Sequence, residues 1–360
     1  MVRGAGTAIV RVVLVLATAL LAACAGPQDR DALLLRVGDA SWTAPAAPYA
    51  ERFLDYALLA DQSYADSLYP QGPGQATPPR PYDLGPDTYC AGRARPGEAC
   101  RDVEGLTPYA IRRLQGWRRI YASKEASDFA CPETRPGCDA PLPGLGVQVW
   151  VKRPRAGAIC PEAAIVFRGT DGRSAGDWLS NLRWALRLLP LYDQYDQVQD
   201  YAPAFVARIE REPCFRRGRT RIVAVGHSLG GGLAQQAAFR EGRIRAVTAL
   251  DPSFVTGESD LDPALVRRNS RGLEIDQIYE RGEVLSYPRL VWEEVVRPPG
   301  CDPLLRRIRL DTARGGPIAQ HSLATLATAL LEWSKTRRDA GLPARSPLPG
   351  PDPASCRPVT

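Results

Sequence analysis

Histidine is scarce in this chain of 360 residues, which contains only two. They are His227 and His321, so any mechanism that needs a histidine base must use one of them. The cysteines include no C-x-x-C pair, which argues against a zinc ribbon or a dithiol redox site. We therefore expect no metal and no cofactor. The sequence also shows no internal repeat.

Neither sign of charge dominates the sequence, which has 46 basic and 40 acidic residues. The net charge of +6 falls to +4 (44 minus 40) once Arg3 and Arg11 are set aside. Basic clusters such as "RRLQGWRRIYASK" are interspersed with acids, so we expect a solvated, arginine-rich surface. That surface is compatible with a weak attraction to anionic lipid headgroups. Nothing in it favours nucleic acid as a partner.

The first 23 residues have the form of an export signal. They carry Arg3 and Arg11 and no acidic residue, and the apolar run "VVLVLATALLAA" follows. A short apolar run that ends in small residues is typical of a secretory signal rather than of a transmembrane helix. The stretch "LAAC" at 21–24 resembles the bacterial lipobox, in which the cysteine is lipidated and becomes the mature N-terminus. We expect Cys24 to be the lipid anchor, with an ordinary signal peptide as the alternative. Because Ala25 and not aspartate follows, the expected location is the outer membrane.

Eight cysteines remain of the nine when Cys24 is set aside, and an even number in an exported protein suggests disulfides. Cys160 and Cys214 each precede a predicted buried strand, so we expect them to pair at one end of a sheet. Proximity in the chain and elimination suggest the other pairs, which are Cys90–Cys100, Cys131–Cys138 and Cys301–Cys356.

The chain divides into four predicted parts. Residues 1–23 are the signal, residues 24–48 a tether, residues 49–340 an α/β-hydrolase-like domain, and residues 341–360 a proline-rich tail. Apolar residues make up 44% of the chain and charged residues 24%, which is enough for a sizeable core.

Strand-like and helix-like segments alternate within the predicted domain. Helical spacing is seen over 49–69, over much of 177–212 with breaks at Pro190 and Pro203, and over 320–339. Strands are predicted at 146–154, 163–170, 221–226, 245–250 and 272–280. This order indicates the α/β class, with a mostly parallel central sheet and helices on both faces. The active site of such a sheet lies at the carboxyl ends of its strands.

Two stretches fit the nucleophile pattern G-x-S-x-G, "GHSLG" at 226–230 and "GRSAG" at 172–176. Ser228 follows the apolar strand "RIVAV" and precedes a helix of small residues, which is the context of a nucleophile elbow. Ser174 lies in a polar loop without a helix directly after it, so we interpret that match as a loop. Ser228 is the predicted nucleophile.

The base and the acid follow from chain order. His227 is next to Ser228 and is expected to point away and pack beside the strand. His321 is thus the candidate base, and the order Ser before His agrees with that of α/β-hydrolases. Asp251 and Glu283 each follow a predicted strand, and either carboxylate is suited to hold the imidazole.

The oxyanion donors are expected at the backbone N–H of Leu229 and at Thr170, in the loop after the strand that ends in "VFRGT". This loop, "AIVFRGTDGRSAGDWLSNL", together with "IVAVGHSLGGGLAQQAA", resembles the fungal-type class 3 lipase family. The resemblance implies Ser228 as nucleophile and Thr170 and Leu229 as oxyanion donors. It also favours Glu283 over Asp251, since "IYERGEVL" aligns with the family's acidic segment. "TALDPSF" resembles the strand-end acid of pancreatic-type lipases, which keeps Asp251 open.

The sequence thus predicts a serine ester hydrolase of the lipase, esterase or phospholipase type, acting through Ser228, His321 and an acid. Its partners are expected to be a lipid or other acyl ester and, through Cys24, the membrane. An acyltransferase on the same machinery, or an inactive envelope lipoprotein with this fold, are the alternatives. The apolar stretch "NLRWALRLLPLYDQY" is expected to be either a lid or a core helix.

Overall fold

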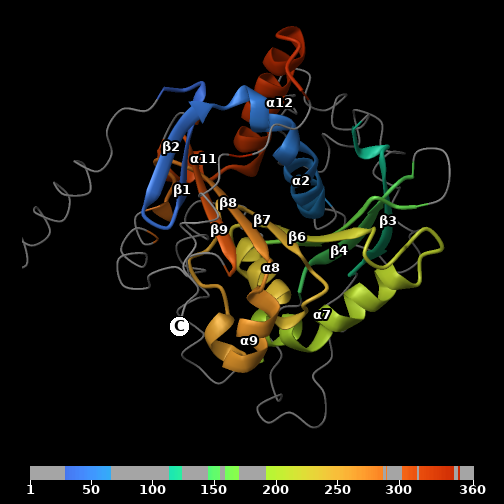
Figure 1. Cartoon of the computed structure of the whole chain (residues 1–360). Helices are drawn as coiled ribbons and strands as arrows, with labels where there is room; N and C mark the ends of the chain where they lie inside the picture. Colours follow the sequence, from blue (N-terminus) through green and yellow to red (C-terminus); the bar gives the residue numbers. More distant parts are fainter. Residues whose placement is uncertain are drawn as a thin grey trace, which may run out of the picture.

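The structure of the protein is a computed structural model, and it describes residues 29–65, 113–123, 145–154, 159–169, 192–286, 289, 302–313, 316–343 and 348. Nine strands form one sheet in the order β2-β1-β9-β8-β7-β6-β5-β4-β3 (Figure 1). The strands are β1 (Ala32–Val37), β2 (Ala40–Pro45), β3 (Trp117–Ala122), β4 (Val147–Lys152), β5 (Glu162–Phe167), β6 (Arg221–His227), β7 (Ala246–Leu250), β8 (Glu274–Glu280) and β9 (Leu304–Leu310). The helices are α2 (Ala47–Ala65), α7 (Gln194–Glu210), α8 (Leu229–Arg240), α9 (Pro263–Ser270), α11 (Pro317–Gln320) and α12 (Leu323–Asp339), with a 3-10 turn at η3 (Glu258–Asp260).

The centre of the sheet is parallel and its edges are antiparallel. Strands β5 to β9 pair in parallel with their neighbours, whereas β4 and β3 on one side and β1 and β2 on the other pair antiparallel. The predicted α/β class with a parallel central sheet is therefore confirmed, and the antiparallel edges are an addition to it. Because the carboxyl ends of β5 to β8 share one edge, the residues that follow these strands are brought together there.

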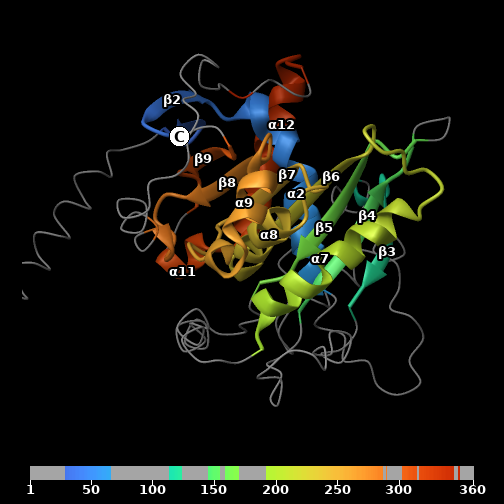
Figure 2. The ribbon, with the colours of Figure 1, turned by 60° about the horizontal axis from the view of Figure 1, so that its bottom comes forward.

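Helices cover both faces of the sheet (Figures 1 and 2). Helices α2 and α12 pack on each other and on one face, while α7, α8 and α9 lie on the other. Strand β5 shows the consequence for side chains, since Ala164 and Val166 face α2 and the alternate residues Ala163 and Ile165 face α7 and α8. A strand buried on both faces needs apolar residues at every position, which explains the unbroken run "AAIVF".

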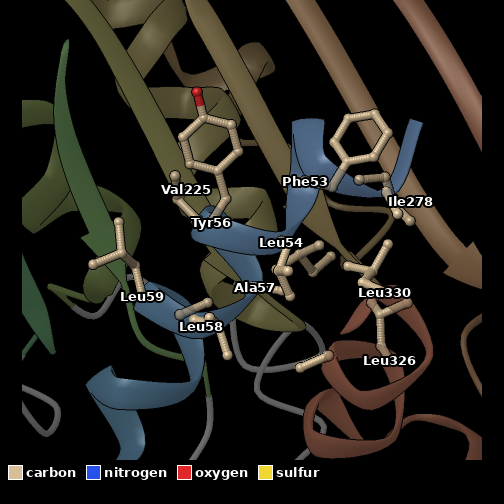
Figure 3. Packing of buried hydrophobic residues seen from close by; sticks show 14 of the residues in the cluster. Phe53, Leu54, Tyr56, Ala57, Leu58, Leu59, Val225, Ile278, Leu326 and Leu330 are labelled. Atoms are coloured by element: carbon tan, nitrogen blue, oxygen red, sulfur yellow. The ribbon is translucent and has the colours of Figure 1, made fainter. Parts of the chain in front are cut away.

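Helix α2 is held between the sheet and α12. Figure 3 shows its apolar side chains against Val225 and Ile278 of the sheet and against Leu326 and Leu330 of α12. Leu54, Leu58 and Leu59 of α2 are fully buried in this cluster. This packing fixes the carboxyl-terminal end of α2, from which a tyrosine reaches the site described below.

The predicted tether over 24–48 is wrong for residues 32–45. These residues form the β1–β2 hairpin, and β1 pairs antiparallel with β9 through partners such as Leu35 and Ile308. Leu33, Leu35 and Val37 alternate as buried residues, and Gly38 provides the positive φ of 53° for the turn. The domain therefore begins before residue 49, and its edge strand comes from the segment assigned to the tether.

The predicted helix break at Pro203 is also wrong, because α7 runs through it. A proline within a helix leaves the carbonyl four residues earlier without its usual donor. Here that carbonyl belongs to Gln199, and it accepts a hydrogen bond from Nε of Arg240 in α8 at 2.9 Å. A tertiary donor thus replaces the missing one.

The predicted Cys160–Cys214 pair is present as a disulfide, with the Cα atoms 5.1 Å apart. It joins the chain before β5 to the chain before β6, as expected from the two strand starts. Cys24 and the other three predicted pairs lie outside the described residues, as do the signal segment 1–23 and Pro190. Of the predicted tail 341–360, the structure describes 341–343 and 348. Among the helices that the structure describes, none is both long and apolar enough to span a membrane.

Candidate active site

Ser228 occupies a strained turn between β6 and α8. Its backbone has φ 56° and ψ −125°, a conformation that residues with a Cβ atom rarely adopt. Its N–H donates to the carbonyl of Leu250 at 3.0 Å, and its carbonyl accepts from the N–H groups of Gly231 and Ser253, each at 2.9 Å. A Cβ atom on Gly226 would lie 2.0 Å from a carbonyl oxygen of the helix, so this position requires glycine. The geometry is that of a nucleophile elbow.

Leu229 is the first residue of α8. N–H groups of the first helical turn have no acceptor within their own helix, so they are suited to bind a developing negative charge. Gly169, at the end of β5, lies against the same serine: a Cβ atom added to it would be 3.2 Å from Cβ of Ser228. Thr170, the other predicted oxyanion donor, lies outside the described residues, as does Ser174 of the second G-x-S-x-G stretch.

His321 is bonded to Glu283. The Nδ1 atom of His321 lies 2.8 Å from Oε2 of Glu283, and the carboxylate is fully buried. The same oxygen accepts a hydrogen bond from the N–H of Leu285 at 2.7 Å, and Arg289 places Nη2 3.0 Å from Oε1. Of the two acids that the sequence left open, Glu283 is thus the one beside the histidine.

Arg289 determines the charge of this carboxylate. Burial raises the pKa of Glu283, but the positive charge of Arg289 and the hydrogen bonds from His321 and Leu285 outweigh it and hold the pKa below its usual value. Arg289 is itself buried, donates to the carbonyl of Pro252 at 2.6 Å, and stacks 4.4 Å from the ring centre of Tyr279. Glu283 is therefore anionic at neutral pH.

Asp251 lies at the end of β7, the strand between those that lead to Ser228 and Glu283. It is fully buried and has a positive φ of 39°. Its Oδ1 accepts a hydrogen bond from the N–H of Glu280 at 3.0 Å, which links the ends of β7 and β8. Burial, followed by the negative charge of Glu283, raises the pKa of Asp251 well above its usual value.

His227 takes part in a chain of hydrogen bonds rather than in simple packing. Nε2 of His227 lies 3.1 Å from the carbonyl oxygen of His321, Nδ1 lies 2.9 Å from the hydroxyl of Tyr64, and that hydroxyl accepts from the N–H of Gly169 at 3.1 Å. A carbonyl only accepts, so Nε2 carries the proton. Burial and the nearby His321 lower the pKa of His227 well below its usual value, so its ring is neutral and Nδ1 accepts from Tyr64.

One group of side chains in the described part of the chain has the spacing of metal ligands. Ligand atoms of His227, Asp251 and His321 lie within 4.8 Å of one another. Both nitrogens of His227 are committed to the hydrogen bonds above, and Nδ1 of His321 is committed to Glu283. The hydrogen bonds therefore explain the group as a network of side chains beside Ser228.

Sequence reasoning missed two residues of this site, Arg289 and Tyr64. Tyr64 comes from α2, 163 residues before His227, and no local motif marks it. Arg289 follows Glu283 by six residues, but nothing in the intervening sequence indicates that the two form an ion pair. For His227 the sequence predicts only a packing role, although its place between the glycine and the serine of the elbow is a local signal for a position beside the site.

Residues 109–250 match the sequence model of a phospholipase-like family, the Tle-like phospholipase domain. These residues include β3 to β7 and the elbow at Ser228. No curated protein matches the chain.

Solved structures similar to this one include several esterases. An esterase of Pyrococcus furiosus is 14% identical, with 62% of this chain and 92% of that chain covered at a TM-score of 0.32. An esterase of Pyrobaculum calidifontis is 12% identical, with 53% and 81% covered at a TM-score of 0.30. Acetyl xylan esterase 1 of a Thermoanaerobacterium species is 13% identical, with 64% and 94% covered at a TM-score of 0.27. The phospholipase match and the α/β sheet together support a lipase- or phospholipase-like hydrolase.

Proposed function

We propose that the chain is a serine ester hydrolase that cleaves an acyl ester, with a lipid or phospholipid as the favoured substrate class. Ser228 is the nucleophile, His321 the general base, and Glu283 the acid that holds the imidazole. The observation that carries this proposal is the bond of 2.8 Å between His321 and Glu283 at the strand edge where Ser228 occupies its elbow.

The chemistry follows from which atoms are already engaged. Glu283 binds Nδ1 of His321, so Nε2 is the nitrogen left to take the proton from the Ser228 hydroxyl. The serine oxygen then bonds to the ester carbon, and the carbonyl oxygen becomes an oxyanion. Collapse of this intermediate expels the alcohol, which takes the proton from His321, and leaves an acyl-enzyme that water hydrolyses by the same steps.

The N–H of Leu229 supports the oxyanion, because it begins α8 directly after the nucleophile. Thr170 is proposed as the second donor, on the strength of its place after Gly169 and of the resemblance to class 3 lipases. Loss of one such donor lowers turnover by about 10²–10³-fold in other serine hydrolases.

A fluorophosphonate probe tests the nucleophile directly, because it labels only an activated serine. We expect the wild-type protein to be labelled and Ser228→Ala to be unlabelled. Ser174→Ala is the matched control, since it removes the serine of the other G-x-S-x-G stretch and should label as the wild type does. Equal labelling of Ser228→Ala and the wild type would contradict the proposal.

The substrate class requires a second experiment. We propose that p-nitrophenyl esters of rising chain length and phospholipid vesicles be compared as substrates of the wild-type protein. Hydrolysis of phospholipid, absent in Ser228→Ala, would support the phospholipase version, whereas turnover of short esters alone would restrict the protein to an esterase.

The proposed membrane anchor is Cys24, in the lipobox-like "LAAC". Palmitate labelling in a bacterial host, lost in Cys24→Ala, is the expected result. Labelling that persists in Cys24→Ala, or its absence from the wild type, would contradict lipidation at this residue.

A further inference from the structure

Two buried carboxyl groups adjoin His321, and the mechanism above uses only one. Glu283 is bonded to the imidazole, whereas Asp251 follows the neighbouring strand and is equally buried. A carboxyl oxygen of Asp251 lies within 4.8 Å of ligand nitrogens of both His227 and His321. Its Oδ2 receives no hydrogen bond from the residues that the structure describes. A second acid therefore lies within a small side-chain movement of the same histidine.

Hydrogen bonds hold the backbone of Asp251 in an unfavourable conformation at the end of β7. Its φ of 39° is unfavourable for any residue except glycine, and asparagine and aspartate tolerate it best. Its N–H donates to the carbonyl of Ile278 at 2.7 Å, and its Oδ1 receives the N–H of Glu280. These bonds fix one oxygen on β8, whereas Oδ2 receives no hydrogen bond from the described residues.

Resting on the proposed function, we propose that Asp251 is a second acid of this site, able to replace Glu283 as the anionic partner of His321. It is a positioning residue, because it acts on the substrate only through the imidazole. The step is a simple acid dissociation, in which Asp251 releases its proton to solvent and its carboxylate then faces His321.

The charges around Asp251 explain why its carboxyl group stays protonated while Glu283 carries the negative charge. Glu283 and Glu280 oppose its ionisation, Arg289 favours it, and His227 is neutral. Arg289 forms its ion pair with Glu283, at 3.0 Å, so its positive charge lowers the pKa of Asp251 only from a greater distance. When the charge of Glu283 is removed, its repulsion disappears and Arg289 becomes available to Asp251, so the pKa of Asp251 falls and the charge moves to the second acid.

The test is a double-mutant cycle with Glu283→Gln and Asp251→Asn. Asparagine tolerates the positive φ and still accepts from the N–H of Glu280, so Asp251→Asn removes only the ability to ionise. Loss of the only acid lowers kcat by about 10⁴-fold in serine proteases. We expect Glu283→Gln to lose about 10²-fold, Asp251→Asn to lose less than Glu283→Gln does, and the double variant to lose about 10⁴-fold.

The pH profile separates this role from a structural one. The ratio of kcat/KM between Glu283→Gln and the double variant should rise with pH, because only the single variant retains Asp251 to ionise. Thermal unfolding of all variants checks that each is folded, and Glu283→Ala provides a second background in which the same dependence on Asp251 is expected.

Equal activities of Glu283→Gln and the double variant would overturn the inference, as would a loss of about 10⁴-fold in Asp251→Asn alone. These outcomes leave the proposed serine ester hydrolysis intact, because the wild type would still depend on Ser228, although the second of them would move the main acid from Glu283 to Asp251. Turnover by Ser228→Ala at the wild-type rate would instead overturn the proposed function, and the second acid with it.

Discussion

The two histidines of this protein lie side by side but have different hydrogen-bond partners. His227 and His321 are equally buried, each 7% exposed, and their ring centres are 4.9 Å apart. His321 is bonded through Nδ1 to the carboxylate of Glu283, whereas His227 lies between a hydroxyl and a carbonyl and stays neutral. The proposed roles, a base for His321 and a scaffold for His227, rest on this difference in the partners of the ring nitrogens.

The largest expected effect is that of replacing His321, the proposed base. His321→Ala should lower kcat/KM by about 10⁴–10⁶-fold, since the proposed mechanism passes the proton of Ser228 to this imidazole. Ester hydrolysis and the rate of fluorophosphonate labelling measure the loss. If His321→Ala kept more than a tenth of wild-type turnover, His321 would not be the base, and the proposed difference between the two histidines would be wrong.

Replacing the scaffold should cost less. His227→Phe keeps a ring of similar size but removes the hydrogen bonds to Tyr64 and to the carbonyl of His321. A small displacement of the catalytic groups costs about 10²-fold in turnover, and each buried group left unpaired costs about 1–3 kcal/mol of stability. Kinetics and chemical denaturation measure the two effects.

His227→Gln is the matched control for that prediction, because a glutamine amide at this position retains a donor near the carbonyl of His321. It should recover part of the turnover that His227→Phe loses. A greater loss in His227→Gln than in His227→Phe would show that the bond to His321 does not position the base.

Tyr64→Phe tests the scaffold role of His227 at the other end of its chain of hydrogen bonds. It removes the hydroxyl that accepts from Gly169 and donates to His227, without touching His321. We expect kcat to fall by about tenfold with KM unchanged, as for one indirect positioning interaction. An effect on KM alone would place Tyr64 in substrate binding instead.

The smallest expected effect concerns stability against pH. The pKa of His227 is lower in the folded protein than its usual value of 6.5. The unfolded chain therefore binds more protons below pH 6.5, and this histidine makes the protein less stable as the pH falls. The contribution is at most about 1.36 kcal/mol per pH unit.

His227→Phe isolates this contribution, because the other titrating groups are common to both proteins. The unfolding free energy of the wild type should fall more steeply than that of His227→Phe as the pH is lowered from 6.5. Parallel curves would mean that His227 is as easily protonated in the folded protein as in the unfolded chain.

The parts of the fold that could be predicted are those specified by short stretches of sequence. The apolar strand before Ser228 and the small residues after it gave the elbow, because both requirements lie within about a dozen neighbouring residues. The Cys160–Cys214 pair followed from two strand starts. In contrast, β9 was missed, since its sequence "LLRRIRL" places Arg306 and Arg307 side by side, which breaks the alternation of apolar and polar residues expected of a strand. Arg306 is tolerated there because Asp276 and Glu274 of β8 neutralise it, a pairing that only the folded sheet reveals.

The choice of acid could not be made from the residues alone. Asp251 and Glu283 follow adjacent parallel strands, so strand-end reasoning treats them alike. What separates them is Arg289, which is close to Glu283 in space and which donates to the carbonyl of Pro252, next to Asp251. Resemblance to a lipase family favoured Glu283, and the bond to His321 is consistent with that preference.

The pairing of β1 with β9 has a consequence for how the chain reaches this state. Leu35 and Ile308 are neighbours in the sheet although most of the sequence separates them. Contacts between such distant residues slow folding, because a long stretch of chain must be ordered before they form. During synthesis the β1–β2 hairpin is made early, yet it has no edge to join until residues 304–310 have left the ribosome. A chain stopped before that point would expose an unpaired hairpin, which makes incomplete molecules prone to aggregate and to be removed by proteolysis.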